Sequence, residues 1–325
     1  MVIVEFIVLL GVIVYAAYLL SKGAEILAAK WGCNIVGSVV LALLTTLPEY
    51  AFVYWASIKG QYQMAIGSAI GSCTLLVTLG YGLVIVLATS RWSKHPVKEI
   101  KLSKATRVDA LYLLLTAIVA YVFIALDNKL TFVEGIILTV LLAGYVYQVF
   151  RSGDEHGVCS DHVPTKKELV RSILELAVGG VLVFLCSEPF VDSMIGLAKK
   201  VNVSPVVIAV ILGPLASEMP EKLTAYLVVM KDGRKAELSV CNFLGSKVNH
   251  NSLLLAVMPF VAHFKGHDSV TNLMSPMFVL MTVLTMIVSG LLMKGRLQKW
   301  QGYSLIGLYA GAMILAVYTQ PAIIH

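Results

Sequence analysis

Two proline–glutamate pairs stand out because each lies deep inside an apolar stretch of the chain. One pair ends the segment Leu44–Glu49, and the other ends the segment Ala216–Glu221. A carboxylate in hydrocarbon costs several kcal/mol, so an acid in such a stretch indicates a functional site. Proline interrupts a helix and frees backbone carbonyls that can face a cation. The paired motifs therefore predict an ion site built on broken helices, as in transporters.

Oxygen-bearing side chains recur at helical spacing beside both acids. Thr45 precedes Glu49 by four residues, so a hydroxyl and a carboxylate share one helix face. Ser217 precedes Glu221 by the same distance, and the spans that follow repeat the spacing with serine and asparagine. Hard cations such as Ca²⁺ and Na⁺ prefer an all-oxygen shell. The candidate ion-site residues are Thr45, Thr46, Glu49, Ser68, Ser72, Ser217, Glu218, Glu221, Asn242, Ser246 and His250.

The second motif differs from the first because it carries an additional acid, Glu218. Two carboxylates about 4 Å apart repel each other by roughly 4 kcal/mol at an effective dielectric constant of about 20. One acid must therefore be protonated or paired, and the available partners are Lys222, Lys247 and His250. Two hypotheses follow: Glu218 forms an internal salt bridge with lysine counter-ions, or the group carries protons.

The elements that position these residues are membrane spans. The chain has 325 residues, of which 58% are hydrophobic and 14% charged, against roughly 25% charged in an average soluble domain. Several apolar runs exceed the roughly 20 residues that cross a bilayer. The apolar N-terminus lacks a basic region and a cleavage site, so we expect a retained span rather than a signal peptide. The five scattered cysteines predict reduced thiols rather than disulfides.

Hydropathy predicts an all-α membrane protein with about ten helices in two inverted five-helix repeats. The predicted domains are residues 1–150, a cytoplasmic linker at 151–167 and residues 168–325. The segment 37–49 aligns on 209–221 without a gap, and 67–72 aligns on 241–246. Two motifs in the same order at similar spacing indicate an internal repeat. The predicted spans are 2–21, 34–58, 63–89, 107–126, 131–150, 169–198, 204–230, 236–262, 270–293 and 302–321.

Basic residues predict the orientation of these spans. Of the 25 lysines and arginines, five fall in loops on the side of the termini and 18 on the other side. The positive-inside rule then places both termini outside the cytoplasm. Lys222 and Lys247 are the remaining two, within the membrane beside the acids. The basic segment from Arg91 to Arg107 is expected to touch anionic lipid headgroups. The positive net charge therefore predicts membrane orientation and not a nucleic-acid partner.

The paired Pro-Glu motifs, each followed by a Gly-Ser segment, resemble the α-repeats of the sodium/calcium exchanger family. This family belongs to the calcium/cation antiporter superfamily. The resemblance covers the whole membrane core and is closest to prokaryotic members without a regulatory domain. It implies a central divalent-cation site at Glu49 and Glu221, with oxygens from Thr45 and Ser217. By the same resemblance, Ser72 and Ser246 line flanking Na⁺ sites, and alternating access moves the ions.

Several positions depart from the family pattern and put the usual Na⁺ stoichiometry in doubt. Leu44 replaces a glycine, Pro214 a small backbone donor, and Glu218 a serine. Leu76 and His250 stand where the family often has polar or acidic residues. A segment at 188–192 also resembles an acid-flanked part of the family, although this match is weak.

The predicted function is secondary active exchange of Ca²⁺ for Na⁺ or H⁺ across the cell membrane. One alternative is an H⁺-coupled or altered-specificity cation transporter of the same fold, and another is a cation channel. We expect no enzyme activity because the motifs supply no nucleophile with a positioned base. The expected partners are Ca²⁺, Na⁺, H⁺ and membrane lipid. Neither a cofactor nor an obligatory protein partner is expected.

Overall fold

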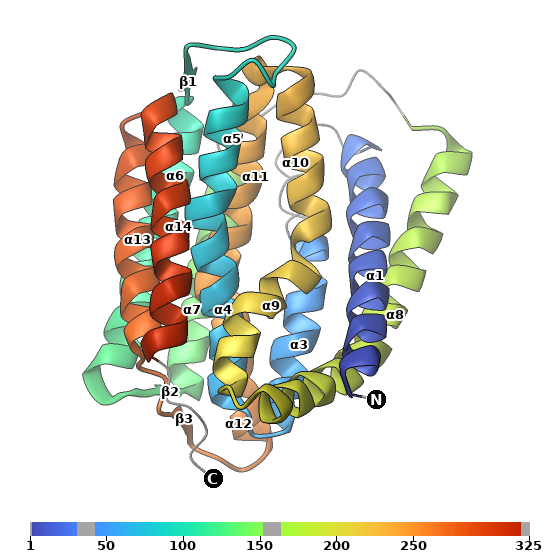
Figure 1. The fold of residues 1–325 in the computed structure, drawn as a ribbon, viewed down its shortest axis with the longest axis vertical. Coiled ribbons are helices and arrows are strands. Elements are labelled where there is room, and N and C mark those ends of the chain that lie inside the picture. The colour runs from blue at the N-terminus through green and yellow to red at the C-terminus, as the bar shows by residue number, and fades with distance from the viewer. Residues whose placement is uncertain (1, 31–42, 152–163, 320–325) are drawn as a thin grey trace.

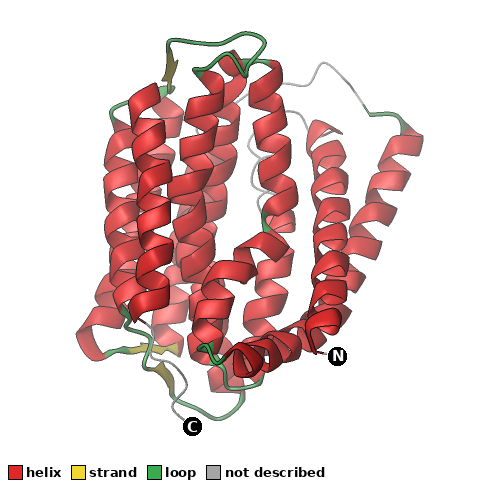
Figure 2. Cartoon of the chain, viewed as in Figure 1, coloured by secondary structure: helices red, strands yellow, loops and turns green. Residues whose placement is uncertain are grey.

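The computed structural model describes residues 2–30, 43–151 and 164–319, and nearly all of them are helical (Figures 1 and 2). The elements up to residue 151 are α1 (Val2–Lys30), α3 (Leu47–Ile58), α4 (Tyr62–Leu75), the π-helical segment η1 (Leu76–Gly80), α5 (Tyr81–Ala88), β1 (Glu99–Lys101), α6 (Lys104–Asp127), β2 (Lys129–Thr131) and α7 (Phe132–Arg151).

The elements after residue 163 follow a similar order. They are α8 (Lys166–Val201), α9 (Pro205–Ser217), α10 (Met219–Lys231), the 3₁₀ turn η3 (Gly233–Lys235), α11 (Ala236–Asn249), the π-helical segment η4 (His250–Leu254), α12 (Leu255–Phe264), β3 (Ser269–Thr271), α13 (Pro276–Met293), β4 (Arg296–Gln298) and α14 (Lys299–Thr319).

Two very short antiparallel sheets join the halves of the chain. Strand β1 pairs with β4 so that Ile100 faces Leu297, and β2 pairs with β3 so that Leu130 faces Val270. Figure 1 shows β1 at the upper end of the helices and β2 with β3 at the lower end. The all-α prediction is therefore corrected to a nearly all-helical fold with a small sheet at each end. These strands form where two loops meet, which hydropathy does not detect.

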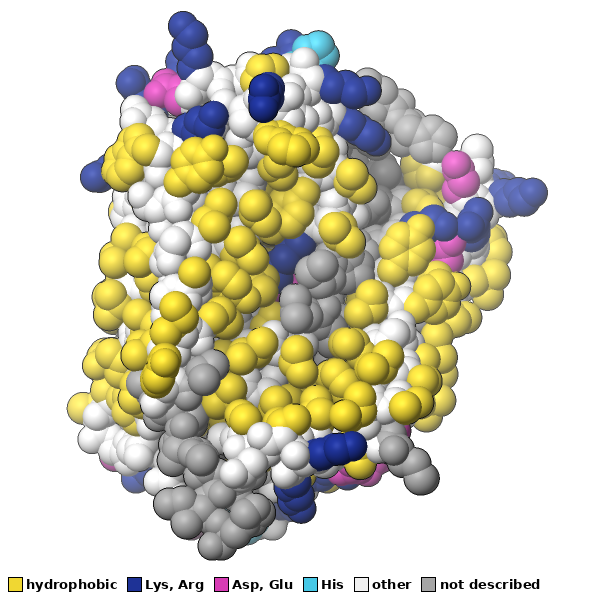
Figure 3. Space-filling model, in the orientation of Figure 1, with side chains coloured by type: hydrophobic (Ala, Val, Ile, Leu, Met, Phe, Trp, Pro, Cys, Tyr) yellow, Lys and Arg dark blue, Asp and Glu magenta, His cyan; other side chains and the backbone are white. Residues whose placement is uncertain are grey.

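Apolar surface is distributed as in a membrane protein. Six helices in the described residues are long and apolar enough to cross a bilayer: Val2–Ala24 of α1, the continuous run Tyr62–Ala88, α6, α7, α8 and α13. Hydrophobic side chains cover the middle of the face in Figure 3, whereas Lys and Arg side chains gather toward its two ends. The chain is therefore a multi-pass membrane protein.

Helices from the two parts of the chain pack against each other throughout the bundle. Helix α1 packs along α8, α6 along α13, and α5 along α14. Helices α4 and α9 approach each other closely at Gly71, where an added Cβ atom would lie 2.1 Å from the carbonyl oxygen of Val210. Because only a residue without Cβ fits there, the predicted close approach through small residues is confirmed. The proposed division at 151–167 is not tested, and most of that linker lies outside the described residues.

Each of the predicted spans contains helix, although several edges and interiors differ. The span predicted at 204–230 is two helices, because α9 ends at Ser217 and α10 begins at Met219. The span predicted at 270–293 is helical only from Pro276, after strand β3. Residues 31–42 of the second predicted span lie outside the described part. Cys73, Cys186 and Cys241 are free thiols, and the other two cysteines are not among the described residues.

Candidate functional site

The site is built around two helix starts that carry proline. Helix α3 begins after Thr46 and α10 begins after Glu218, with Pro48 and Pro220 in their first turns. A first-turn proline is tolerated because the N–H that it lacks would have no partner within the helix. The segments that follow each motif also match, since both α4 and α11 run into π-helical segments, η1 and η4. Such segments occur often at functional sites.

Glu49 is a buried acid with one carboxylate oxygen unsatisfied by the described residues. It lies in the first turn of α3 with 2% of its surface exposed, and its Oε2 atom has no hydrogen-bond partner among the described residues. One ligand atom each from Glu49, Glu218 and His250 lie within 4.8 Å of one another. A buried carboxylate oxygen without a partner is costly, so its presence indicates that an ion or a proton supplies the missing contact.

Glu218 is paired at both carboxylate oxygens. Its Oε1 atom accepts a hydrogen bond from Lys247 Nζ at 2.7 Å, and its Oε2 atom accepts one from Lys222 Nζ. His250 Nε2 lies 3.2 Å from Oε1 without forming an aligned hydrogen bond. All four side chains are at most 3% exposed. The internal salt bridge expected as one hypothesis for Glu218 is therefore present, with both lysines engaged.

A small cavity beside Glu49 brings predicted residues of both halves together. Its volume is about 10 Å³, close to the space that one water molecule occupies. Glu49, Ser68 and Ser217 contribute to its wall. Its other lining residues are Ile13, Pro48, Phe52, Ser187, Phe190 and Gly213. The cavity thus joins one carboxylate to hydroxyl groups in a mostly apolar wall.

The remaining predicted residues are placed as follows. Thr45, Thr46, Ser72 and Ser246 are buried, and the Oγ of Ser72 has no hydrogen-bond partner in the described part of the chain. The carbonyl oxygen of Ser246 lies 2.6 Å from His250 Nδ1. Asn242 is the least buried predicted residue whose side chain is described. Glu221 belongs to α10, but its side chain is outside the described part.

Two buried amides, Asn249 and Asn251, were not among the predicted site residues. Asn249 accepts a hydrogen bond from the hydroxyl of Tyr50 and donates one to Thr46 Oγ1 at 3.3 Å. Asn251, at the start of η4, leaves its Nδ2 without a partner among the described residues. Buried amides within an apolar span are a sequence signal, and their positions near the second motif could have identified them.

Glu175, Glu188 and Asp192 lie outside the two motifs and form ion pairs with lysine or arginine. Lys59 Nζ lies 3.2 Å from Glu188 and 3.0 Å from Asp192, and both carboxylate side chains are about half exposed. Glu175 pairs with Lys22 and Arg171, each at 2.8 Å. The segment 188–192 therefore contributes its acids to a surface ion pair and not to the buried group around Glu49.

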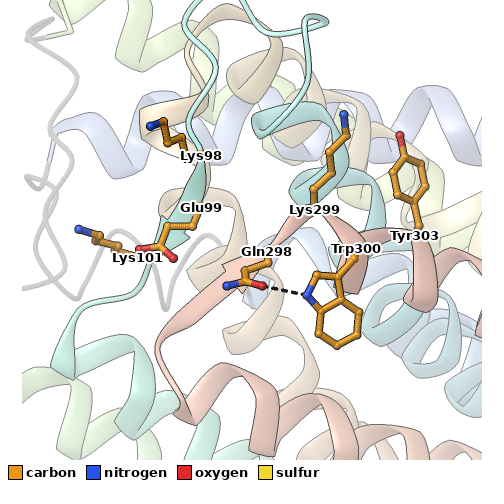
Figure 4. Close-up of a pocket in the computed structure, with 7 residues that line it drawn as sticks. All are labelled: Lys98, Glu99, Lys101, Gln298, Lys299, Trp300 and Tyr303. Carbon is orange, nitrogen blue, oxygen red and sulfur yellow. Dashed lines mark hydrogen bonds between the residues drawn. The ribbon is translucent and has the colours of Figure 1, made fainter.

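A larger cavity of about 880 Å³ opens at the end of the molecule that carries β1 and β4. Figure 4 shows its lining, in which Trp300 Nε1 donates a hydrogen bond to Gln298 at 2.8 Å. The ammonium of Lys299 lies 6.0 Å from the centre of the Tyr303 ring. The remaining lining residues are Lys98, Glu99 and Lys101. This basic, aromatic cavity is separate from the buried acids and lacks their chemistry.

The buried group has the chemistry of a cation site. It offers a free carboxylate oxygen and several hydroxyls, which are hard ligands. Acids inside a membrane bundle mark ion and proton pathways. The site residues whose side chains are described, both the predicted ones and the two additional asparagines, lie on a few elements. These are α3, α4, α9, α11 and η4, together with the connections before α3 and α10.

Comparisons with known proteins agree with this architecture. Over 314 residues the chain is 24% identical to an uncharacterized membrane protein of Methanocaldococcus jannaschii, covering 95% of this chain and 94% of that protein. A crystal structure of the H⁺/Ca²⁺ exchanger CAX superposes with a TM-score of 0.81 at 19% identity, covering 97% of this chain and 85% of the other. The sodium-calcium exchanger NCX_Mj superposes with a TM-score of 0.67 at 22% identity, covering 97% and 99%.

The sequence model of the sodium/calcium exchanger protein family matches residues 1–151 and 171–318. This match spans both Pro-Glu motifs and nearly all described helices. The resemblance inferred from the motifs is thus confirmed, and the chain belongs to the sodium/calcium exchanger protein family.

Proposed function

We propose that this protein is a secondary active antiporter that exchanges Ca²⁺ for Na⁺ or H⁺ through a site at Glu49. The observation that carries the proposal is the buried, unpartnered Oε2 of Glu49 beside a small cavity lined by Ser68 and Ser217. Membership of an exchanger family and the folds of the H⁺/Ca²⁺ and sodium-calcium exchangers support the same function. Family membership also supports a transporter rather than an enzyme.

Alternating access is the proposed mechanism, and it rests on two inverted repeats of five helices. The matching helix starts at Leu47 and Met219 and the matching π-helical segments η1 and η4 support this arrangement. The two sheets support it too, because a twofold exchange of the halves converts the β1–β4 pair into the β3–β2 pair. In repeats of this kind the broken helices meet near the midplane, and one half rocks against the other.

Exchange follows if the Glu49 carboxylate binds either Ca²⁺ or the coupling ion but not both. The cavity beside Glu49, about 10 Å³ in volume, is close to the size of one water molecule, which favours one ion at a time. Thr45, Thr46, Ser72, Glu221 and Ser246 are proposed to complete the oxygen shells as the cations enter and leave. The mechanism requires no cofactor and no protein partner, because the cations are cargo.

H⁺ coupling is the second candidate, and one observation favours it. His250 Nε2 lies 3.2 Å from Glu218 in a group that also faces Glu49. Histidine is the side chain that changes charge most readily between about pH 5 and 8. A proton that binds this group would repel a cation at Glu49, which is the coupling that an antiporter needs.

Flux in proteoliposomes tests the function. Radiolabelled Ca²⁺ uptake is measured with Na⁺, K⁺ and H⁺ gradients imposed one at a time. An antiporter requires a counter-ion gradient, whereas uptake that proceeds equally without any gradient would identify a channel. Transport that produces no pH change and is constant from about pH 5 to 8 would exclude H⁺ coupling. Undiminished Ca²⁺ transport by Glu221→Gln would contradict the site assignment.

We place both termini outside the cytoplasm on the charge asymmetry, and assign the cavity of Figure 4 to the cytoplasmic side. Its three lysines and the exposed Trp300 and Tyr303 are the residue types that contact anionic headgroups and the membrane interface. Anionic phospholipid is therefore the proposed lipid partner at this end.

A further inference from the structure

The buried lysines beside Glu218 are chemically unusual for a cation transporter. Lys222 is 2% exposed and Lys247 is fully buried, and each ammonium contacts a different oxygen of the same carboxylate. A lysine is almost never fully buried unless it is paired. Two ammonium groups and one carboxylate give Glu218, Lys222 and Lys247 together a net positive charge. This charge disfavours a further cation at Glu218 itself.

These three charges are present in one half of the chain only. In the internal alignment, Glu218 corresponds to Thr46. Continuing each aligned segment by one residue pairs Lys222 with Tyr50 and Lys247 with Cys73. The corresponding side chains of the first half are thus all uncharged, and Asn249 hydrogen-bonds two of them. The acid and both lysines therefore have no charged counterparts in the first half.

The ammonium groups occupy the positions that a cation bound to Glu218 would need. Lys247 Nζ lies 2.7 Å from Oε1, and Lys222 Nζ contacts Oε2. Each ammonium carries the same charge as Na⁺, but its side chain holds it in place. A cation next to Glu218 would have to displace one of these two ammonium groups from the carboxylate.

We propose that Lys222 and Lys247 are tethered cations that permanently fill a subsite at Glu218, so that no Na⁺ binds there. This proposal rests on the function proposed above and defines its ion stoichiometry. The transported ions then bind beside Glu49 and not beside Glu218. The protein therefore moves at least one coupling ion fewer than an exchanger whose corresponding subsite is free to bind Na⁺. Glu218 then acts on specificity through charge and is not a ligand of the transported ion.

The test opens the subsite by removing one tethered charge. Lys247→Gln and Lys222→Gln are purified in detergent, and thermal unfolding is followed as NaCl replaces choline chloride at constant ionic strength. We expect each variant to gain a Na⁺-specific stabilisation beyond that of the wild type. Its half-saturating Na⁺ concentration should be lower by roughly 10- to 1,000-fold, the effect of one unit charge about 4 Å away at an effective dielectric constant of about 20. The double variant Glu218→Gln/Lys247→Gln should lose this gain, because the anion that holds Na⁺ is gone.

Two further variants separate charge from packing. Lys247→Arg keeps the positive charge and should gain no Na⁺ effect. Lys129→Gln removes an exposed lysine that pairs with Asp127 at 2.9 Å and should behave as the wild type. If Lys247→Gln fails to fold, Lys222→Gln gives the same measurement at the other oxygen. Folded single variants without a new Na⁺ effect, or a gain that persists in the double variant, would overturn the proposal.

The same variants distinguish this inference from the proposed function. In proteoliposomes, the wild type should exchange Ca²⁺, and Lys247→Gln should acquire additional dependence on a Na⁺ gradient. Absence of exchange in the wild type would refute the proposed function. The Na⁺-dependent stability of the variants in detergent would still test the subsite at Glu218. Exchange in the wild type without a new Na⁺ effect in either folded variant would refute the tethered cations alone.

Discussion

Replacing Glu49 by glutamine tests two effects of its buried carboxyl group. One is on the affinity for Ca²⁺, and the other is on the stability of the protein without ions. The substitution preserves shape but removes the charge from a side chain that is 2% exposed and has no hydrogen-bond partner for Oε2 among the described residues. Loss of one partner from a buried ionic contact costs about 3–5 kcal/mol. At about 1.4 kcal/mol per tenfold change in affinity, half-saturating Ca²⁺ should rise roughly 140- to 3,700-fold.

The same substitution should increase the free energy of unfolding in ion-free buffer. A buried polar group without a partner destabilises a protein by about 1–3 kcal/mol, and an ionised one by more. Glu49→Gln should therefore be more stable than the wild type by about 1 kcal/mol or more without ions. Wild type and variant should differ less in saturating Ca²⁺, because only the wild type gains stability from the bound ion.

Two measurements check this prediction. Ca²⁺ uptake into proteoliposomes gives the half-saturating concentration, and thermal unfolding in chelator and in Ca²⁺ gives the change in stability. Glu188→Gln is the matched control, because this acid is 45% exposed and pairs with Lys59 at the surface. Its removal should alter stability by at most about 1 kcal/mol. Uptake by Glu49→Gln at wild-type half-saturation, or a variant less stable than the wild type in chelator, would show that Glu49 is a structural contact.

Three further predictions follow from the packing and the polar contacts. Gly71→Ala should destabilise the protein by about 1–3 kcal/mol or more and impair transport, because its Cβ would meet the backbone of Val210 at 2.1 Å; Gly144→Ala, with nothing within 4 Å, is the control, and equal thermal stability of the two variants would contradict the close packing. Tyr50→Phe and Asn249→Leu should each cost about 1–2 kcal/mol, and a double-mutant cycle should give a coupling energy of about 1 kcal/mol; additive effects would argue against their hydrogen bond. Replacing Lys98, Lys101 and Lys299 together by glutamine should weaken the binding of anionic phospholipid to the detergent-solubilised protein by about 1 kcal/mol per lysine, with no change in the binding of neutral lipid; an equal loss for both lipids would refute headgroup binding.

Local spacing in the sequence predicted a substantial part of the fold. Hydropathy identified helices in every predicted span, because a bilayer requires long apolar runs that leave a clear signal. The glycine spacing of α4 predicted a close helix approach, and the structure confirms this at Gly71. The internal repeat predicted matching motifs, and the structure begins helices at both of them. The edges of α13 and the two small sheets could not be predicted, since they depend on how distant loops meet.

The candidate site was predicted as a set of residue types but not as a set of contacts. Helical spacing indicated that Lys222, four residues after Glu218, could pair with it. Lys247 is 29 residues from Glu218 in sequence. It reaches the Oε1 atom of Glu218 because α10 packs beside α11. Asn249 reaches Thr46 over 203 residues of sequence, a contact that no local pattern encodes.

The sequence by itself determined that this protein crosses a membrane, belongs with exchangers of cations and carries acids where a bilayer makes them costly. These properties follow from hydrophobicity and charge, which each residue brings with it. The tertiary structure determined which of the two buried acids, Glu49 or Glu218, is paired with lysine. Glu218 and Glu49 have the same side chain, but packing brings two ammonium groups to the first and leaves an oxygen of the second without a hydrogen-bond partner among the described residues. Their surroundings differ because only the assembled helices define the nearest neighbours of a buried charge, and these neighbours control its energy in a medium of low dielectric constant.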